Sequence, residues 1–165
     1  MAKFLGNNKL DFKIENMIKS YKRTSIPSDE ETTALLGKPL MQEKIFHENL
    51  PKEIKEYCKK KLKLNKYNAN INIMKPATVC FIHIDNHEYT AKMFEEEIKD
   101  FRRILVFLND WSDGQCFGYG TNTLTDWKAG DTYTVGPNES HWAANAGTKS
   151  KYTLVISVWH EELDG

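Results

Sequence analysis

The sequence has few cysteines, no long apolar run and no excess of charge, and each absence excludes a class of protein. Three cysteines occur among 165 residues and none forms a CxxC pair, so neither a disulfide framework nor a zinc ribbon is expected. No apolar stretch approaches the roughly 20 residues of a membrane-spanning helix, and no apolar signal-peptide core follows the first residues. We therefore expect a cytoplasmic protein with reduced thiols and no membrane partner.

Charge is balanced over the whole chain, which contains 23 basic and 23 acidic side chains. The second part of the chain, residues 67–165, is net acidic, with 8 Lys and Arg against 14 Asp and Glu. Because a phosphate backbone attracts Lys and Arg, a nucleic-acid substrate is not expected.

The composition changes near residue 66, although a length of 165 residues predicts one domain over 1–165. Residues 1–66 are predicted to be helices with polar connections. Apolar residues recur at helical spacing from Phe12 to Tyr21, and Pro51 is a favourable first residue for a second helix. We expect this region to support or cover the rest of the chain, or to form the contact of a homodimer.

Residues 67–160 are predicted to be β-structure, because short β-branched and aromatic segments are separated by turns rich in Gly, Asp and Asn. The segment Thr90–Asp100 is expected to be a loop or short helix over the mouth of a barrel. The predicted fold class is therefore mainly β with N-terminal helices (α+β) and a jelly-roll or closed-barrel core. The expected strands are Ile71–Met74, Val79–Asp85, Ile104–Leu108, Cys116–Tyr119, Asn122–Trp127, Thr132–Val135, His141–Asn145 and Tyr152–Trp159.

Two histidines and one carboxylate form the strongest candidate site. His83 and Asp85 are two residues apart, so on a strand their side chains point to the same face. His141 follows a Gly-Pro turn and would come from a distant strand. Two histidines and a carboxylate are the ligands of a non-haem Fe(II) centre that leaves positions open for other ligands.

The other histidines leave alternatives open at this site. His87 shares the strand face of His83 if the strand continues, so it is an alternative ligand. His47 and His160 are expected to be surface or packing residues. With five histidines in the chain, a single HxD pattern also arises by chance.

Lys151 opens the last predicted strand and shares one face of it with Thr153. A lysine that points into an apolar barrel is costly unless an anion pairs with it. A bound dicarboxylate would supply that anion, and the Thr153 hydroxyl would bind the same carboxylate. The alternative is an exposed lysine at the start of a strand, and the pattern alone favours neither.

Residues 70–159 resemble the Fe(II)- and 2-oxoglutarate-dependent dioxygenases, with the prolyl 4-hydroxylase-like branch as the nearest. The order and spacing of several segments carry this resemblance. They are His83 with Asp85, Arg103–Trp111, Gly114–Phe117, Lys128–Asp131, His141 and Lys151–Leu154. Two departures are that Met74 lies near the place of a common tyrosine, and that many relatives have arginine where Lys151 stands.

The resemblance implies a hydroxylase whose core, residues 67–160, is a double-stranded β-helix of the cupin-like type. It implies Fe(II) on His83, Asp85 and His141, and 2-oxoglutarate with its far carboxylate on Lys151 and Thr153. Arg103 is the next candidate for that carboxylate. Dioxygen would be the second co-substrate, and ascorbate would serve as reductant. The expected reaction hydroxylates an amino-acid, peptidyl (prolyl-like) or small-molecule C–H bond and releases succinate and CO2.

One alternative is another metal-dependent cupin enzyme, such as a thiol dioxygenase or an isomerase. Residues 130–145 resemble the second cupin motif, although Pro137 is one residue too close to His141. The first cupin motif requires HxH followed by glutamate, whereas this chain has Asp85 in the second position. That mismatch favours the dioxygenase.

The other alternative is a non-catalytic β-sandwich that binds a sugar or a peptide through exposed aromatic side chains. The candidates are Trp111, Tyr119, Trp127 and Trp142. Aromatic residues of a β-rich domain more often belong to its core. Dependence on iron would separate this alternative from both enzymes, and dependence on 2-oxoglutarate would separate the dioxygenase from other cupins.

Overall fold

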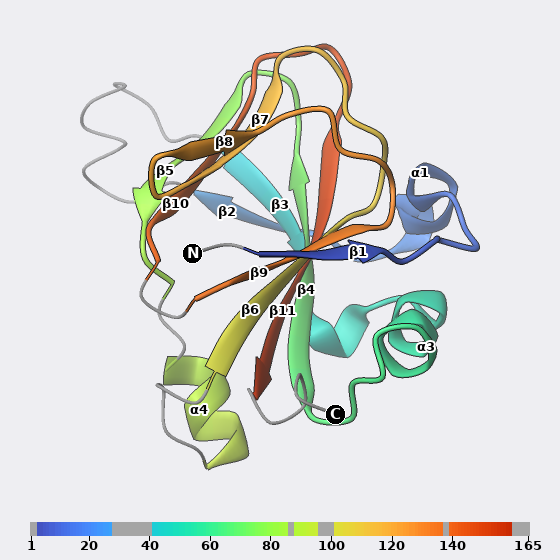
Figure 1. Ribbon diagram of the computed structural model, residues 1–165. Coiled ribbons are helices and arrows are strands. Elements are labelled where there is room, and N and C mark those ends of the chain that lie inside the picture. Colours follow the sequence, from blue (N-terminus) through green and yellow to red (C-terminus); the bar gives the residue numbers. More distant parts are fainter. Residues whose placement is uncertain (1–2, 28–40, 86–87, 96–100, 137–138, 160–165) are drawn as a thin grey trace.

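The computed structural model describes residues 3–27, 41–85, 88–95, 101–136 and 139–159, which form two antiparallel sheets and several short helices (Figure 1). Among these residues the larger sheet has seven strands in the order β1-β9-β6-β11-β4-β3-β2. Its strands are β1 (Lys3–Asn7), β9 (Asp131–Val135), β6 (Phe101–Phe107), β11 (Lys151–Trp159), β4 (Tyr67–Met74), β3 (Met41–Ile45) and β2 (Thr24–Pro27). The smaller sheet has the order β5-β10-β7-β8. Its strands are β5 (Thr78–His83), β10 (His141–Asn145), β7 (Gln115–Tyr119) and β8 (Asn122–Leu124).

The helices are α1 (Ile14–Met17), the 3₁₀ helices η1 (Ile18–Ser20) and η2 (His47–Asn49), α3 (Lys52–Lys60) and α4 (Glu88–Phe94). Helices α1 and α3 lie on one side of the larger sheet, whereas α4 lies on the other side, near the end of β6 (Figure 1). Buried side chains of α1 and α3, such as Ile14 and Ile54, form one core with alternate residues of β4, β6 and β11. Because side chains alternate along a strand, this outer core leaves the opposite face of the same three strands free to face the smaller sheet.

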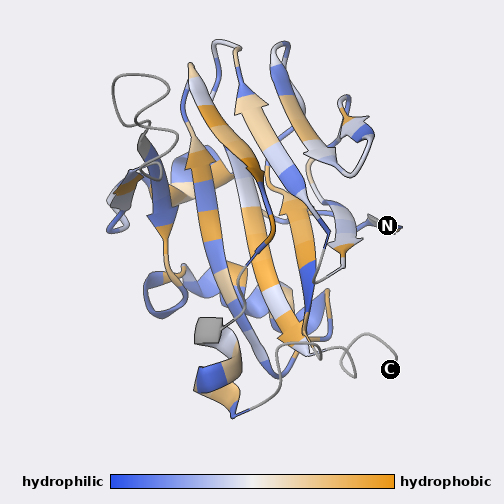
Figure 2. Ribbon diagram, turned by 90° about the vertical axis from the view of Figure 1, so that its left-hand side faces the viewer, coloured by the Kyte–Doolittle hydropathy of each residue, from blue (hydrophilic) through white to orange (hydrophobic). Residues whose placement is uncertain are grey.

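A second, smaller core lies between the two sheets. Phe107 stacks on Trp127 with 4.1 Å between the ring centroids, and both side chains are buried together with Phe117 and Val155. Figure 2 shows that strands of the larger sheet carry hydrophilic as well as hydrophobic residues along their length. Polar side chains, among them Asn72 and Thr153, line a cavity between the sheets.

The predicted fold class is confirmed: the protein is mainly β, with N-terminal helices and a jelly-roll core. Each expected strand is present, although β5 ends at His83 rather than at Asp85 and β8 ends at Leu124 rather than at Trp127. The expected element at Thr90–Asp100 is the short helix α4 in its described part, and residues 96–100 lie outside the described residues. No helix in the described part of the chain is long and apolar enough to cross a membrane.

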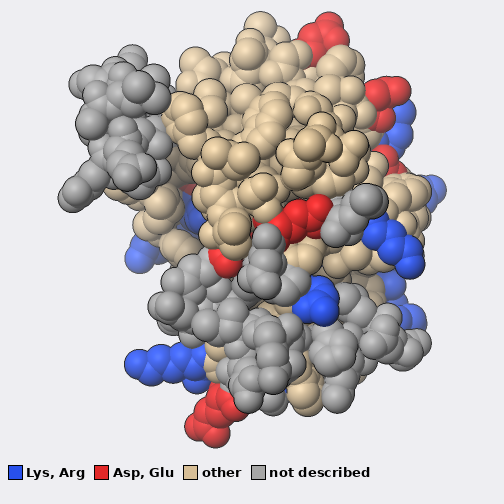
Figure 3. Space-filling model, turned by 60° about the vertical axis from the view of Figure 1, so that its left-hand side comes forward, with Lys and Arg blue, Asp and Glu red and all other residues tan. Residues whose placement is uncertain are grey.

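The N-terminal region differs from its purely helical prediction, because β1, β2 and β3 also lie there. The helix expected from Phe12 to Tyr21 is reduced to α1 and η1, whereas the second expected helix is α3. Polar strands such as β3 are stabilised by pairing with a neighbour rather than by local propensity, and β3 pairs with β4. On the face shown in Figure 3, the described acidic and basic side chains are interspersed.

Candidate metal centre and cavity

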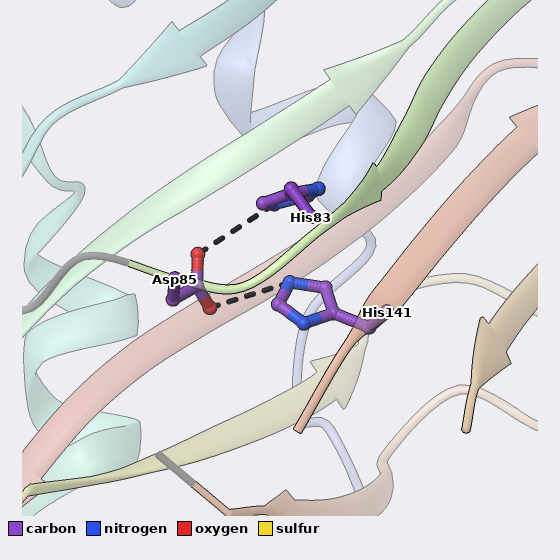
Figure 4. A group of neighbouring side chains, drawn as sticks. All are labelled: His83, Asp85 and His141. Atoms are coloured by element: carbon purple, nitrogen blue, oxygen red, sulfur yellow. Dashed lines mark ion pairs between the residues drawn. The ribbon is translucent and has the colours of Figure 1, made fainter. Parts of the chain in front are cut away.

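The three predicted metal ligands lie together at the edge of the smaller sheet (Figure 4). His83 and His141 are directly opposite each other in the register of the neighbouring strands β5 and β10. Asp85 follows just beyond the end of β5. One ligand atom of each of these residues lies within 4.8 Å of the others. Sequence reasoning placed two of them on one strand and the third on a distant strand, and the fold brings them together.

The charges of this cluster favour an ionised carboxylate between two ring nitrogens. Asp85 Oδ2 lies 3.3 Å from His141 Nε2, and Asp85 Oδ1 lies 3.7 Å from His83 Nε2. Burial alone would raise the pKa of Asp85, but the His83 contact and the charge of Arg103 hold it well below its usual range. The contact with Asp85 raises the pKa of His83 to about 10, whereas burial lowers the pKa of His141.

Both imidazoles are oriented by backbone carbonyls on their far side. His83 Nδ1 lies 2.8 Å from the Phe81 carbonyl oxygen, and His141 Nδ1 lies 3.1 Å from that of Glu139. A ring N–H that donates to a carbonyl leaves Nε2 as the atom that each ring turns toward Asp85. The second proton, which the raised pKa keeps on His83, would be released when a metal binds its Nε2. Both Nε2 atoms therefore face Asp85 as available ligand atoms, in the donor set that suits a divalent metal.

Arg103 belongs to the metal cluster rather than to the opposite end of the cavity. This buried side chain comes from β6. Its Nε atom lies 2.7 Å from Asp85 Oδ2, and its NH1 group donates a 3.0 Å hydrogen bond to Ser157 Oγ. The structure thus gives Arg103 a carboxylate partner of its own within the protein.

A cavity of about 560 Å³ lies between the sheets and joins the metal cluster to Lys151. This volume falls within the range of about 300–1,000 Å³ typical of small-molecule sites. Phe117 separates the two ends: its ring centroid lies 6.0 Å from that of His141 and 5.5 Å from Lys151 Nζ. One aromatic ring therefore spans the distance between the two ends.

Lys151 is buried at the end of the cavity, so the structure favours the inward orientation of the two that the sequence left open. The side chain is 1 % exposed, and Nζ donates a 3.0 Å hydrogen bond to the Cys116 carbonyl oxygen. The rings of Phe107, Phe117 and Trp127 surround Nζ at 5.3–5.7 Å. Burial lowers the pKa of Lys151 to about 8. Within the described part of the chain, no carboxylate pairs with it.

The expected partners of Lys151 lie on the same inner face. Thr153 shares that face of β11 and lines the cavity. Met74, which stands near the place of a tyrosine common in the dioxygenases that the sequence resembles, is opposite Lys151 in register on β4 and also lines the cavity. Met74 offers no hydroxyl, so Thr153 is the hydroxyl closest in sequence to Lys151 on this face.

Polar residues of β3 and β4 also line the cavity, and sequence reasoning missed them. Asn70 and Asn72 each have a buried side-chain oxygen without a hydrogen-bond partner. An unpaired buried group of this kind costs about 1–3 kcal/mol. Lys44 lines the same wall from β3. The signal was an asparagine at every second position of a strand whose other residues are apolar, Asn68 to Asn72.

The remaining histidines take no described part in the cluster. His47 Nδ1 accepts a 3.1 Å hydrogen bond from the Ala69 amide, and His47 also lines the cavity. His87 and His160 lie outside the described residues. Among the aromatic side chains considered for a binding surface, Trp127 is fully buried, and Trp111 and Tyr119 pack against the inner core.

No model of a known protein family and no curated protein matches the chain. Solved structures are similar to it. An oxidoreductase of the 2OG-Fe(II) oxygenase family from Burkholderia pseudomallei is 12% identical, with a TM-score of 0.59, over 89% of this chain and 77% of that one. A predicted oxalate decarboxylase from Thermotoga maritima is 15% identical, with a TM-score of 0.50, over 85% of this chain and 94% of that one.

A sugar phosphate isomerase of the cupin superfamily from Silicibacter pomeroyi is 10% identical, with a TM-score of 0.48, over 86% of this chain and 73% of that one. At such identities a likeness reports on the fold and not on the reaction. The prolyl 4-hydroxylase-like branch stays a prediction. The protein has the double-stranded β-helix fold, with a candidate His-Asp-His metal site at one end of its cavity.

Proposed function

We propose that the protein is a non-haem Fe(II)- and 2-oxoglutarate-dependent oxygenase. The observation that carries the proposal is the pairing of two features across one cavity. A cluster with the donor set of an Fe(II) site lies at one end. A buried lysine, to which no carboxylate in the described part of the chain is paired, lies one aromatic ring away. A five-carbon keto diacid suits this arrangement, because its keto acid would face the cluster while its far carboxylate meets the lysine.

His83, Asp85 and His141 would hold the metal. Their fit rests on two imidazole nitrogens turned toward one ionised carboxylate, with all three ligand atoms within 4.8 Å of one another. When bound, Fe(II) supplies the activation of dioxygen that oxidative decarboxylation of 2-oxoglutarate to succinate and CO2 requires. Arg103 would act as a positioning residue, because its ion pair keeps Asp85 ionised and turned toward the histidines.

Lys151 and Thr153 would bind the far carboxylate of 2-oxoglutarate. The three aromatic rings around Lys151 Nζ exclude water from this end of the cavity. An ion pair in such a low-dielectric environment is stronger than one at the surface. The carboxylate would also offset the cost of burying the ammonium group, so the site is selective for a ligand with an anionic group at this distance from the metal.

Release of succinate tests the proposal. The Fe(II)-loaded protein is incubated with 2-oxoglutarate, dioxygen and ascorbate, and succinate is quantified. Such uncoupled turnover needs no knowledge of the substrate that is hydroxylated. We expect succinate that depends on iron and is absent from the Asp85→Asn variant. Iron binding without any succinate would reject the proposal.

A second candidate is another metal-dependent cupin chemistry, favoured by the likeness to the predicted oxalate decarboxylase. Oxalate has two carbons and could not reach from the metal cluster to Lys151, so that lysine would have no role in its binding. Replacing 2-oxoglutarate by oxalate in the same assay separates the two candidates. Consumption of oxalate that is unaffected by Lys151→Met would favour the second candidate.

A further inference from the structure

We infer that the substrate to be oxidised is a free amino acid, held by Lys44, Asn70 and Asn72 on the wall of the cavity formed by β3 and β4. This inference rests on the proposed function and names the substrate class of the same site. It separates a free amino acid from a residue within a peptide chain, which the proposed function leaves open.

The three residues form a continuous polar patch beside the proposed 2-oxoglutarate site. Lys44 is opposite Asn72 in the register of β3 and β4, and Asn72 is opposite Thr153 in the register of β4 and β11. These three residues all line the cavity. Lys44 and Thr153 thus lie on the two strands that flank β4. Because neighbouring strands are about 4.8 Å apart, the two residues are separated by about twice that distance. The patch therefore borders the space assigned to 2-oxoglutarate without coinciding with it.

Lys44 is a partly buried cation on the wall of the cavity. No carboxylate among the described residues forms an ion pair with it. Glu43, its neighbour along β3, is paired with Arg23 and Lys75, and Asp85 is paired with Arg103. Burial lowers the pKa of Lys44, and a bound carboxylate would offset the cost of that burial. An anionic group on the ligand thus fits this position.

Lys44 lines the same cavity as the three residues of the metal cluster. A carboxylate bound to Lys44 would therefore lie beside the cluster. Carbons next to that carboxylate would then be within the reach of the metal site. This placement is what an oxygenase of C–H bonds needs from its substrate-binding group.

The asparagines require hydrogen-bond donors. The side-chain oxygens of Asn70 and Asn72 are buried and accept no hydrogen bond, and both residues line the cavity. An ammonium group offers up to three N–H donors and would satisfy both oxygens. A carboxylate for Lys44 and an ammonium group for the asparagines are the two ends of a free amino acid. A residue inside a peptide chain has neither charge.

Thermal unfolding of the Zn(II)-loaded protein with saturating 2-oxoglutarate tests the inference without turnover. The probes are the twenty free L-amino acids, each beside its N-acetylated, C-amidated counterpart. A ligand that binds the native state raises the midpoint of unfolding. We expect at least one free amino acid, and none of the blocked counterparts, to raise the midpoint in the wild type.

Variants connect that shift to the patch. Charged hydrogen bonds of this kind change affinity by about 10- to 100-fold. The affinity for the free amino acid should therefore fall by that factor in Lys44→Met and in Asn72→Leu. Lys59 is exposed on α3, and Lys59→Met is the matched control, which should leave the affinity for the free amino acid unchanged. Titration of 2-oxoglutarate in the same variants should give the wild-type affinity.

Three outcomes would overturn the inference: no free amino acid raises the midpoint, a blocked counterpart does so equally, or Lys44→Met leaves the shift intact. If 2-oxoglutarate binds in those cases, the proposed function stands and only the substrate class is wrong. If 2-oxoglutarate fails to bind while a free amino acid binds through Lys44, the proposed function is wrong and the amino-acid subsite stands.

Discussion

The two ends of the cavity satisfy their charges in opposite ways. At the metal end, Asp85 is surrounded by His83, His141 and Arg103, so each charge has a partner within the protein. At the other end, Lys151 contacts a backbone carbonyl and three aromatic rings, and it pairs with no carboxylate of the described residues. The first end is electrostatically complete before any ligand arrives, whereas the second is completed by an anion. A protein retains such a buried unpaired cation at a cost in stability, which a ligand-binding role explains.

The largest expected effect is the loss of Fe(II) affinity when a ligand of the metal cluster is replaced. Asp85→Asn keeps the shape of the side chain but removes the charge that both Nε2 atoms face. Loss of groups that merely support a metal ligand costs about 10- to 100-fold in affinity, so loss of a ligand should exceed that range. Calorimetric titration with Fe(II) under anaerobic conditions measures it.

The exposed Asp113→Asn serves as the control for that experiment and should retain wild-type affinity for Fe(II). Wild-type iron affinity in Asp85→Asn would remove Asp85 from the proposed site. His87 would then become the next ligand to test.

Lys151→Met should change two measurable quantities, the affinity for 2-oxoglutarate and the stability of the ligand-free protein. The affinity for 2-oxoglutarate should fall by about 100-fold, because a buried charged hydrogen bond is lost, while the affinity for Fe(II) stays unchanged. Without ligand, the variant should unfold at a higher denaturant concentration than the wild type. The lowering of the Lys151 pKa from 10.5 to about 8 corresponds to a burial cost of about 3 kcal/mol.

The matched control is Lys149→Met, two residues earlier and exposed, which should change neither quantity. Equal 2-oxoglutarate affinity in wild type and Lys151→Met would assign the carboxylate to another group. A less stable Lys151→Met variant would show that the lysine supports the fold.

The affinity for 2-oxoglutarate should depend on pH, because Lys151 titrates without a carboxylate partner among the described residues. Above a pKa of about 8, Lys151 is neutral in the ligand-free protein, so binding of the anion requires uptake of one proton. The affinity for 2-oxoglutarate should then fall by about tenfold for each pH unit above 8. The stability of the ligand-free protein should change in the opposite sense. A lowered lysine pKa makes the unfolded chain bind more protons between pH 8 and 10.5, so this residue's contribution to stability rises over that window.

The smallest effect is expected from Thr153→Val, which removes one hydroxyl from the Lys151 end and keeps the shape of the side chain. A single neutral hydrogen bond contributes about 1 kcal/mol, so the affinity for 2-oxoglutarate should fall by about fivefold. The Thr123→Val variant on β8, outside the cavity lining, is the control. An unchanged affinity would leave the far carboxylate to Lys151 alone.

Sequence reasoning predicted the two ends of the cavity because each depends on a local rule. The spacing of two keeps Asp85 close to His83 although β5 ends at His83, and on β11 the same spacing puts Lys151 and Thr153 on one face. The partner strands were recognisable as β-structure, so the jelly-roll core and its strands could also be predicted. What the sequence could not supply is the register that brings His141 opposite His83.

The wall of the cavity between those ends escaped prediction for a different reason. Strand β3 is Met-Gln-Glu-Lys-Ile in sequence, which is too polar to be recognised as a strand. It exists because it pairs with β4, and this long-range pairing places Lys44 in the cavity. Arg103 was similarly assigned to the 2-oxoglutarate end by resemblance, but the structure pairs it with Asp85.

The central claim is that one ligand joins the metal cluster to Lys151. Anaerobic titration of the Fe(II)-loaded protein with 2-oxoglutarate, followed by the visible metal-to-ligand charge-transfer band, tests it most directly. We predict a saturable band in the wild type, the same band at much higher 2-oxoglutarate concentration in Lys151→Met, and no band in Asp85→Asn. Bound iron without a band, or a band whose midpoint is the same in wild type and Lys151→Met, would contradict the claim.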